Sequence, residues 1–576
     1  MKTNLNYPFF LGLIFLFSNT ESAFSKDYFF HPKNGNDRNS GLSSNEPFQT
    51  LSKFNELILL PGDRILLAGG EIFPGTLELK GFKGKDGLPL VITSFSPEGN
   101  SVVSPARIDA KGFANGILIQ NSSFVQVENL EITAEGYGSA TPEGTMRVGV
   151  LILATGEGQV KGITLDKLKI SRVYFEEKGF VRGAEEVKSA NGTQRYGWGI
   201  RLINHSESAM IEEVQILNSE VNDVSHTGIK LTGTNSQNIR RITIAGNKVN
   251  QTGGPGIQMS GVKFVHVSDN EVTYSGSTDD SRKWGRGSGL WTWGSSMVLI
   301  EKNKFMYANG PGDSAGAHID YNCDNIVLQY NLSAHNAGGF IEVLGNNYNC
   351  AYRYNISVND GHREKGQNGA FQEGKTFWLS GYQGEKKERK GPVNSYFYNN
   401  TIYVSEDLVS KVAIDNRSKG ILIANNIFHV LGETKQVAGD QYLPDDQTKR
   451  DVEHVFFKHN LLLRENIWPS EVIIQAEYSL FGDPEFSNPG GLKLEDYIPG
   501  NSGLVENGIE IPFLPEDEFG LIEGLNLQTD ILGNPIDGKP GIGAIKVSDS
   551  MAEKGKNASK NDFFPSSKSA QKPINP

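Results

Sequence analysis

Two acidic residues form a pair whose spacing could support acid–base chemistry. Asp320 and Glu342 lie 22 residues apart, and each directly follows an isoleucine, Ile319 or Ile341. If both isoleucines point into a core, alternation places both acids on the outer face of adjacent strands, with carboxyl groups roughly 5 Å apart. Like charges this close raise one of the two pKa values. The pair therefore predicts a proton-holding acid beside an ionised base, which hydrolysis of a glycosidic bond requires.

A separation of about 5 Å favours the retaining form of that reaction. We assign Asp320 as nucleophile and Glu342 as general acid/base, and we expect Phe340 and nearby tryptophans to provide apolar surroundings that raise a carboxyl pKa. Asp313 and Asp415 are rival acids. Two alternatives stay open: plain surface charge paired with Lys or Arg, and a calcium site made by Asp313, Asp320 and Glu342. No other cofactor is expected.

The same outer face carries a row of side chains suited to binding sugars. By alternation, four side chains of successive strands project beside His318, namely Arg201, Lys230, Gln258 and Trp291. Trp293 falls in register with Asp320, and Trp284 lies in the adjoining loop. Tryptophan rings stack on sugars, and an outward tryptophan on a sheet has no core to justify it. The two stacked cations repel each other, which an anionic ligand would offset. The row predicts a sugar groove, with an acidic glycan as its narrower form, unless loops cover the tryptophans.

Two further functions remain as alternatives. A polysaccharide lyase needs a base and a group that neutralises a uronate carboxylate, and the candidates are His318, Tyr321, Arg353, Lys230 and Arg201. His226 and His318 could also shuttle protons, or simply bond to backbone at corners. A non-catalytic, glycan-binding adhesin would have a uniform outer surface, whereas His, Asp, Glu and Trp are concentrated between residues 284 and 342.

A repeating architecture must position these residues, because one short phrase recurs along the chain. The phrase is apolar-x-x-Asn-x-apolar, with its asparagine at Asn247, Asn270, Asn303, Asn331, Asn355, Asn400, Asn426 and Asn460. Gly-led strands such as 256–259 follow several copies. Self-similarity at intervals of this size marks a solenoid, and Val- and Ile-rich strands broken by Gly and Asn make it β. We predict an all-β, right-handed parallel β-helix with a stacked asparagine ladder.

Irregular steps between the copies indicate loops of varying length. The expected loops are 135–147, 175–195, 277–288, 361–374 and 382–391. Long loops on a solenoid gather on one face and build its binding site.

The N-terminal residues predict export. Lys2 precedes an apolar stretch at 9–17 and a small-x-small site at 23–25, so residues 1–25 form a predicted signal peptide. The apolar run is too short to span a bilayer as a helix. We therefore expect a secreted or periplasmic protein without a membrane span.

The segment 27–50 resembles the entry segment of exported bacterial β-helix proteins of the pectin-lyase-like superfamily, and 530–546 resembles their closing segment. The acidic pair also resembles that of β-helix glycoside hydrolases, some of which draw two acids from neighbouring coils. The resemblance implies a carbohydrate-active protein. It also implies an N-terminal cap at 26–62 and a β-helix domain at 63–546, which leaves a Lys-, Ser- and Pro-rich tail at 547–576 as disordered.

The net charge of the chain restricts which classes of molecule it is expected to bind. The formal net charge of -12 argues against general nucleic-acid affinity, which needs a basic surface. The expected partner is a poly- or oligosaccharide, and the chain is expected to be a monomer. Cys323 and Cys350 each follow a Tyr-Asn pair, so they occupy related corners. They are either a disulfide or two small buried residues.

Overall fold

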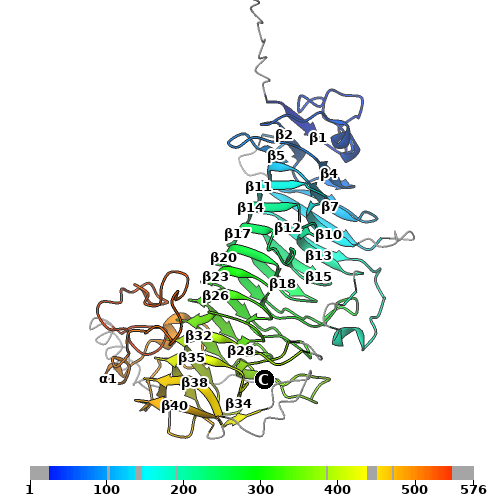
Figure 1. Ribbon diagram of the computed structural model, residues 1–576. Coiled ribbons are helices and arrows are strands. Elements are labelled where there is room, and N and C mark those ends of the chain that lie inside the picture. The colour runs from blue at the N-terminus through cyan, green and yellow to red at the C-terminus, as the bar shows by residue number, and fades with distance from the viewer. Residues whose placement is uncertain are drawn as a thin grey trace, which may run out of the picture.

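The computed structural model describes residues 25–99, 104–137, 146–189, 192–193, 195–383, 387–437, 451–469 and 472–547. Apart from Ser25 and Val547, the predicted signal peptide and the predicted tail lie outside these residues. Figure 1 shows the described strands stacked as successive coils along one long axis. From β2 to β37, each coil contributes one strand to each of three parallel sheets, which we call A, B and C, and the coils at the two ends contribute to sheet A or to sheets A and B only. The predicted right-handed parallel β-helix is confirmed.

Sheet A has fifteen strands within the described residues. They are β1 (Asp27–Phe30), β2 (Arg64–Ala68), β5 (Leu90–Phe95), β8 (Ser123–Glu128), β11 (Gln159–Asp166), β14 (Met210–Leu217), β17 (Ile239–Ala245), β20 (Val262–Ser268), β23 (Ser296–Glu301), β26 (Asp324–Gln329), β29 (Ala351–Arg353), β32 (Val393–Tyr398), β35 (Lys419–Ala424), β38 (Asp451–Lys458) and β40 (Ile473–Glu477).

Sheet B follows sheet A in every coil. Its strands are β3 (Ile72–Pro74), β6 (Ala106–Asp109), β9 (Leu130–Glu135), β12 (Lys169–Tyr174), β15 (Glu220–Val224), β18 (Lys248–Thr252), β21 (Glu271–Thr273), β24 (Lys304–Met306), β27 (Leu332–Ala334), β30 (Ile356–Val358), β33 (Thr401–Val404), β36 (Ile427–Val430), β39 (Leu461–Leu462) and β41 (Leu480–Phe481).

Sheet C closes each coil and carries the candidate site. Its strands are β4 (Leu77–Lys80), β7 (Asn115–Gln120), β10 (Arg147–Ala154), β13 (Gly197–Asn204), β16 (Ile229–Thr232), β19 (Ile257–Ser260), β22 (Leu290–Trp293), β25 (Ala317–Ile319), β28 (Gly339–Val343), β31 (Lys375–Leu379), β34 (Ser410–Ile414) and β37 (Thr434–Gln436). The helices are short: η1 (Leu51–Glu56), η2 (Glu186–Lys188), η3 (Leu494–Tyr497) and α1 (Ser502–Val505).

The asparagine ladder is confirmed in full. Each amide Nδ2 donates to the Oδ1 of the next asparagine, from Asn247 to Asn270 at 2.9 Å and on to Asn426 and Asn460 at 3.0 Å. Each Oδ1 also accepts from the backbone N–H of the preceding ladder residue, as in Asn247 N to Asn270 Oδ1. The ladder satisfies polar groups at the buried corner between sheets A and B, where an unpaired group would be costly.

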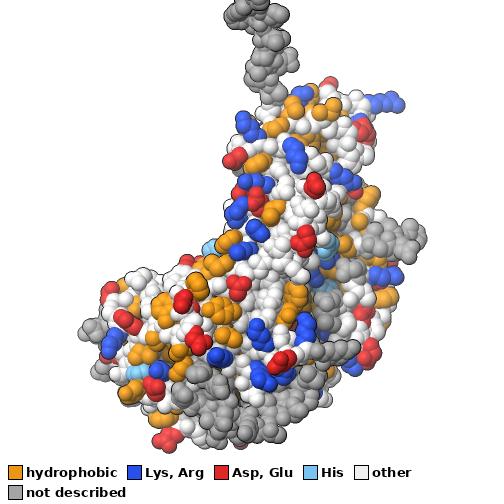
Figure 2. All heavy atoms as spheres, in the orientation of Figure 1, with side chains coloured by type: hydrophobic (Ala, Val, Ile, Leu, Met, Phe, Trp, Pro, Cys, Tyr) orange, Lys and Arg blue, Asp and Glu red, His pale blue; other side chains and the backbone are white. Residues whose placement is uncertain are grey.

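The two ends of the solenoid are covered in different ways. At the N-terminal end, β1 pairs with β2, and η1 buries Leu51 and Phe54 in the main core. At the other end, the coils continue to β41. From there residues 482–547 fold back against the outer faces of the later strands and project sideways from the column in Figure 1. Acidic and basic side chains are intermingled on the face seen in Figure 2.

Four of the five predicted loops share one edge of the solenoid. The segments 135–147, 175–195, 277–288 and 361–374 all connect a strand of sheet B to the following strand of sheet C, whereas 382–391 connects sheet C to sheet A. The prediction that long loops gather on one face is thus confirmed for these four. Among the described residues, no helix is long and apolar enough to cross a bilayer. Cys323 and Cys350 are buried free thiols.

Candidate functional site

One column of outward side chains runs along sheet C, and we call it the outer column. Register pairs its members in successive strands: Arg201, Lys230, Gln258, Trp291, His318, Glu342 and Trp378. The first five were predicted to share this row, and the structure brings them together. Trp378 was missed, because the loop at 361–374 separates its strand from the preceding repeat. The apolar-Trp-apolar pattern of residues 377–379 was the available signal, since 290–292 shows a similar one.

The predicted contact between Asp320 and Glu342 is wrong by two residues. Ile319 pairs with Val343, and Ala315 bridges to Gly339, so Glu342 lies beside His318 instead. Asp320 is therefore diagonal to Glu342, with Cα atoms roughly 8 Å apart by strand rise and spacing. Both acids still face outward from sheet C, but the close pairing that favoured the retaining mechanism is absent.

His318 is buried between these acids and the strand before. Its Nδ1 lies 2.9 Å from the hydroxyl of Ser288, and its ring lies 5.6 Å from that of Trp291. Burial lowers the pKa of His318 to about 4, although the nearby Asp313 opposes that effect. His318 is therefore neutral at physiological pH and acts as a hydrogen-bonding group there.

Asp313 joins the site from the loop before β25. Its carboxylate accepts two hydrogen bonds from Arg286, at 2.7 and 3.0 Å. Burial raises the pKa of Asp313, but the charge of Arg286 and its hydrogen bonds, together with the charge of Arg363, outweigh burial and leave that pKa below its ordinary value. Arg363 donates to the carbonyl of Asp313 at 2.9 Å. Burial lowers the pKa of Arg363, and the charges of Asp313 and Glu342 oppose that effect. An ionised aspartate, two guanidinium groups and a second acid thus surround His318.

Two buried indoles flank these acids on the outer column. Trp291 and Trp378 are 8% and 6% exposed, and within the described part of the chain their Nε1–H groups have no hydrogen-bond partner. A buried donor without an acceptor is costly, so a bound hydroxyl or ether oxygen would stabilise both. The ammonium of Lys375 lies 3.8 Å from the ring centre of Trp378.

A more open aromatic surface lies next to Asp320. Trp293 is 38% exposed, and its ring lies 5.9 Å from that of Tyr321. Lys387 approaches the other aromatic ring of this pair, with its ammonium 5.2 Å from the centre of Tyr321. Both aromatic residues were predicted to contact sugar, and the structure places them where they are accessible.

Trp284 and His226 are not on this surface. The indole stacks on the imidazole at 4.6 Å with 13° between planes, and its Nε1 donates to the Glu186 carbonyl at 3.2 Å. Trp284 belongs to a small hydrophobic cluster with Tyr196 and Trp198, where the loop that carries Glu186 packs on it. Loop burial therefore explains this tryptophan, and its predicted stacking on sugar is wrong.

Two other predicted positions also need correction. Phe340 points inward and packs in the main core, 5.8 Å from the ring of Tyr352. It occupies the corner where earlier coils have Gly228 and Gly256, whose added Cβ atoms would also meet core valines. Arg353 lies on sheet A beneath the C-terminal segment and donates to the Ile522 carbonyl at 2.9 Å, so it cannot contact a ligand on sheet C.

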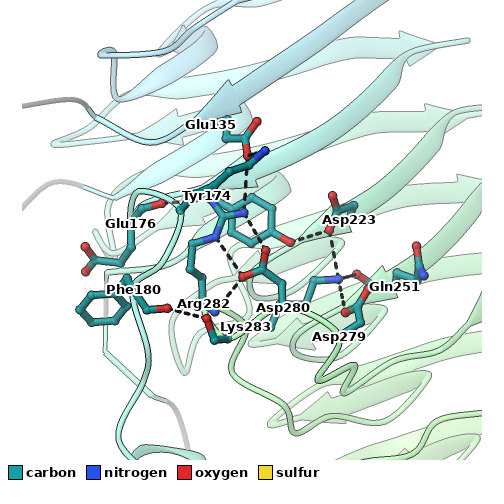
Figure 3. A network of polar contacts seen from close by, with 12 residues as sticks. Glu135, Tyr174, Glu176, Phe180, Asp223, Gln251, Asp279, Asp280, Arg282 and Lys283 are labelled. Atoms are coloured by element: carbon teal, nitrogen blue, oxygen red, sulfur yellow. Dashed lines mark hydrogen bonds and ion pairs between the residues drawn. The ribbon is translucent and has the colours of Figure 1, made fainter.

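The covering loops are fastened by a polar network, drawn in Figure 3. Arg282 binds Asp280 at 2.7 Å, and its guanidinium lies over the ring of Tyr174 at 3.6 Å. Lys283 bridges Asp223 at 3.1 Å and Asp279 at 2.8 Å. Because Tyr174 of β12 and Asp223 of β15 belong to two earlier coils, the loop at 274–289 is held against the upstream coils.

The remaining candidates are Asp415 and the calcium site. Asp415 is fully buried and accepts hydrogen bonds from Arg389 at 2.7 Å and from Gly381 N–H at 2.9 Å, which fits a structural role. In the described ranges, no three His, Cys, Asp or Glu side chains are gathered as metal ligands. A cavity of about 580 Å³ lies behind Arg363, lined by Asn309, His362 and Gln367 among others, and it includes none of the predicted site residues.

Three parallel sheets around one apolar core define the class of protein, a right-handed parallel β-helix. Residues 198–402 match the family model for a right-handed beta helix region, as the resemblance noted from the sequence implied for the fold.

Two particular relatives stand out. The chain is 25% identical over 501 residues to a lacto-N-biosidase of Bifidobacterium longum subsp. longum, a match covering 72% of this chain and 30% of that protein. A solved GH136 lacto-N-biosidase from Eubacterium ramulus superposes with a TM-score of 0.50 and 18% identity, over 79% of this chain and 68% of the other. The chain thus spans under a third of the length of its curated relative.

Proposed function

We propose that this protein is a glycoside hydrolase that cleaves an oligosaccharide on the outer face of sheet C. The observation that carries the proposal is the clustering of Asp313, Asp320 and Glu342 around one neutral histidine, between two buried indoles that lack hydrogen-bond acceptors. The similarity to a lacto-N-biosidase over 72% of the chain supports the same reaction class. Sugars present both the hydroxyl groups and the apolar ring faces that such a surface binds.

The three carboxylates divide by environment. Asp313 is fixed as an anion by Arg286, whereas Asp320 lies at the more open end beside Trp293. We assign Asp320 as the nucleophile, because it is accessible and accepts a hydrogen bond from the N–H of Tyr321 at 2.7 Å. We assign Glu342 as the proton donor, because Asp313 is held ionised by Arg286. Direct attack by Asp320 would retain the anomeric configuration, whereas the wider diagonal spacing of Asp320 and Glu342 fits inversion with Asp320 as the base that activates water, so the configuration of the product distinguishes the two roles.

A glycan panel tests the reaction class. The protein is incubated with neutral and acidic oligosaccharides and with 4-nitrophenyl lacto-N-bioside, while reducing ends and absorbance near 235 nm are followed. New reducing ends without absorbance support a hydrolase. Absorbance from an unsaturated product would show the lyase that the sequence left open, and binding without either signal would show an adhesin.

Matched variants test the residues. Asp320→Asn is expected to abolish turnover while binding survives. In Asp320→Gly, added azide is expected to take the place of the missing carboxylate and restore turnover, with a glycosyl azide as the product. Loss of the proton donor is expected to cost about 10²–10⁴-fold on an oligosaccharide, but little on an aryl glycoside with a good leaving group. Glu342→Gln is therefore expected to show this dependence on the leaving group, whereas Asp313→Asn, which removes the ionised partner of Arg286, should lower activity on both substrates. The exposed turn residue Asp269 provides the control, Asp269→Asn, and full activity in Asp320→Asn would refute the assignment.

The location follows as part of the same proposal. The basic and apolar residues at the start of the sequence support export, so the protein would meet its sugar outside the cytoplasm as a monomer. Detection of a mature form beginning near Lys26, in the culture medium or periplasm, tests this point.

A further inference from the structure

Two cations stand one above the other at the upstream end of the outer column. Arg201 of β13 pairs directly with Lys230 of β16. The two residues are only 4% and 8% exposed. Their backbones are parallel neighbours about 4.8 Å apart, so two positive charges are brought together in a largely dehydrated environment.

No acidic side chain compensates Lys230. Among the described residues, no hydrogen bond or ion pair reaches its ammonium. Burial lowers the pKa of Lys230 to about 7, and the charge of Arg201 lowers it further in the same direction. Burial also lowers the pKa of Arg201 to about 10. A buried ammonium without a partner opposes folding, so Lys230 itself calls for a ligand that supplies a negative charge.

Other buried cations near the same face are treated differently. Lys283 binds two aspartates, Lys411 binds Glu373 at 2.7 Å, and Arg286 binds Asp313 at 2.7 Å. The fold therefore places a carboxylate beside each of these buried charges. Lys230 departs from that pattern on the face that carries the candidate site.

The position of Lys230 relates it to the reacting groups. Gln258 and Trp291 separate it from His318 along the outer column, which is three strand steps, or roughly 14 Å. A short oligosaccharide lying along the column would thus reach from the acids, past the indole of Trp291, to Lys230.

We propose that Lys230, with Arg201 beside it, forms a subsite for the carboxylate or sulfate of an acidic sugar, two or more units from the bond that is cleaved. The distance of the subsite from the cleaved bond rests on the proposed function. Anion binding by the subsite does not depend on hydrolysis. The substrate class is accordingly an acidic oligosaccharide.

Binding to the full chain tests the subsite without turnover. Glucuronic acid, N-acetylneuraminic acid and glucose 6-sulfate are titrated by calorimetry or ligand-observed NMR, with glucose as the neutral probe. We expect at least one acidic sugar to bind at least tenfold more tightly than glucose, and the carboxylate and sulfate probes distinguish the two anions. Equal binding of acidic and neutral probes by the wild-type protein would overturn the proposal, whatever happens in any variant.

Two substitutions localise the effect. Lys230→Met keeps the apolar stem and removes the charge, so the preference for the acidic probe should be lost, while Lys230→Arg should keep it. Lys248→Met, at an exposed lysine of β18, is the matched control. An undiminished preference in folded Lys230→Met would refute the location. Absence of any hydrolysis would refute the proposed function but leave this binding result to stand.

Discussion

Asp360 occupies a buried place where an asparagine would be expected. Its Oδ1 accepts from both the backbone N–H and the Nδ2 of Asn336 at 2.9 Å, and its Oδ2 accepts from the Ser357 hydroxyl at 2.8 Å. Asn336 makes the equivalent bond to the N–H of Ala308 one coil earlier. These bonds favour the ionised carboxyl, but burial outweighs them and raises the pKa of Asp360 from 3.8 to about 7.

The raised pKa of Asp360 predicts both the direction and the size of the change in folding stability caused by Asp360→Asn. Each step of one in pKa corresponds to about 1.4 kcal/mol, so ionising this carboxyl in the folded state costs about 4 kcal/mol of folding free energy. The penalty is absent below pH 3.8, grows between there and pH 7, and is complete above about pH 7. Asparagine keeps the acceptor for Asn336 and carries no charge. The variant should therefore exceed the wild type in stability by up to about 4 kcal/mol at pH 8, and by little at pH 4.

Urea unfolding followed by tryptophan fluorescence, at several pH values between 4 and 8, measures this difference. Asp86→Asn, at an exposed aspartate between β4 and β5, provides the control for a change of net charge. A variant less stable than the wild type at pH 8 would refute the reasoning, as would a stability difference that does not change with pH.

Three further outcomes are expected. Asn331→Ala breaks the ladder on both sides and should lower stability by about 2 kcal/mol or more, whereas Asn322→Ala at an exposed turn should cost less in the same urea assay. Trp378→Phe removes one indole N–H while keeping a ring, and should lower kcat/KM by up to about tenfold; unchanged kinetics would remove Trp378 from the sugar site. Gly256→Ala would place a Cβ 2.2 Å from Val272 and should prevent normal folding, while Gly183→Ala, which meets nothing within 4 Å, should leave the melting temperature unchanged.

The fold was predictable because its determinants repeat. The asparagines at the A-to-B corners from Asn247 to Asn460, and the glycines at the corners before many strands of sheet C, are required by contacts that recur from coil to coil, such as Gly228 against Val249 and Gly256 against Val272. Repetition makes such residues visible in a single sequence. The outer column from Arg201 to His318 followed from alternation alone, since each of its five residues comes two positions after a glycine at the corner of its coil.

The errors arose where alternation leaves a choice. Ile341 and Val343 both point inward, so either could have been aligned with Ile319, and only the bridge between Ala315 and Gly339 decides. The prediction that Phe340 faces outward was wrong because a residue at the corner of a coil packs inward regardless of the alternation along the strand. Trp284 depends on a long loop, whose path no local pattern reveals.

The position of the long loops has a consequence for how such a chain can diversify. Every insertion at the B-to-C edge leaves one coil and returns to the same corner, so its length changes neither the stacking of the ladder nor the pairing of the sheets. Residues can be gained or lost there, one coil at a time, without repacking the interior. The rim around the proposed sugar site is thus uncoupled from the scaffold that holds it, and its shape can be re-engineered by exchanging single loops.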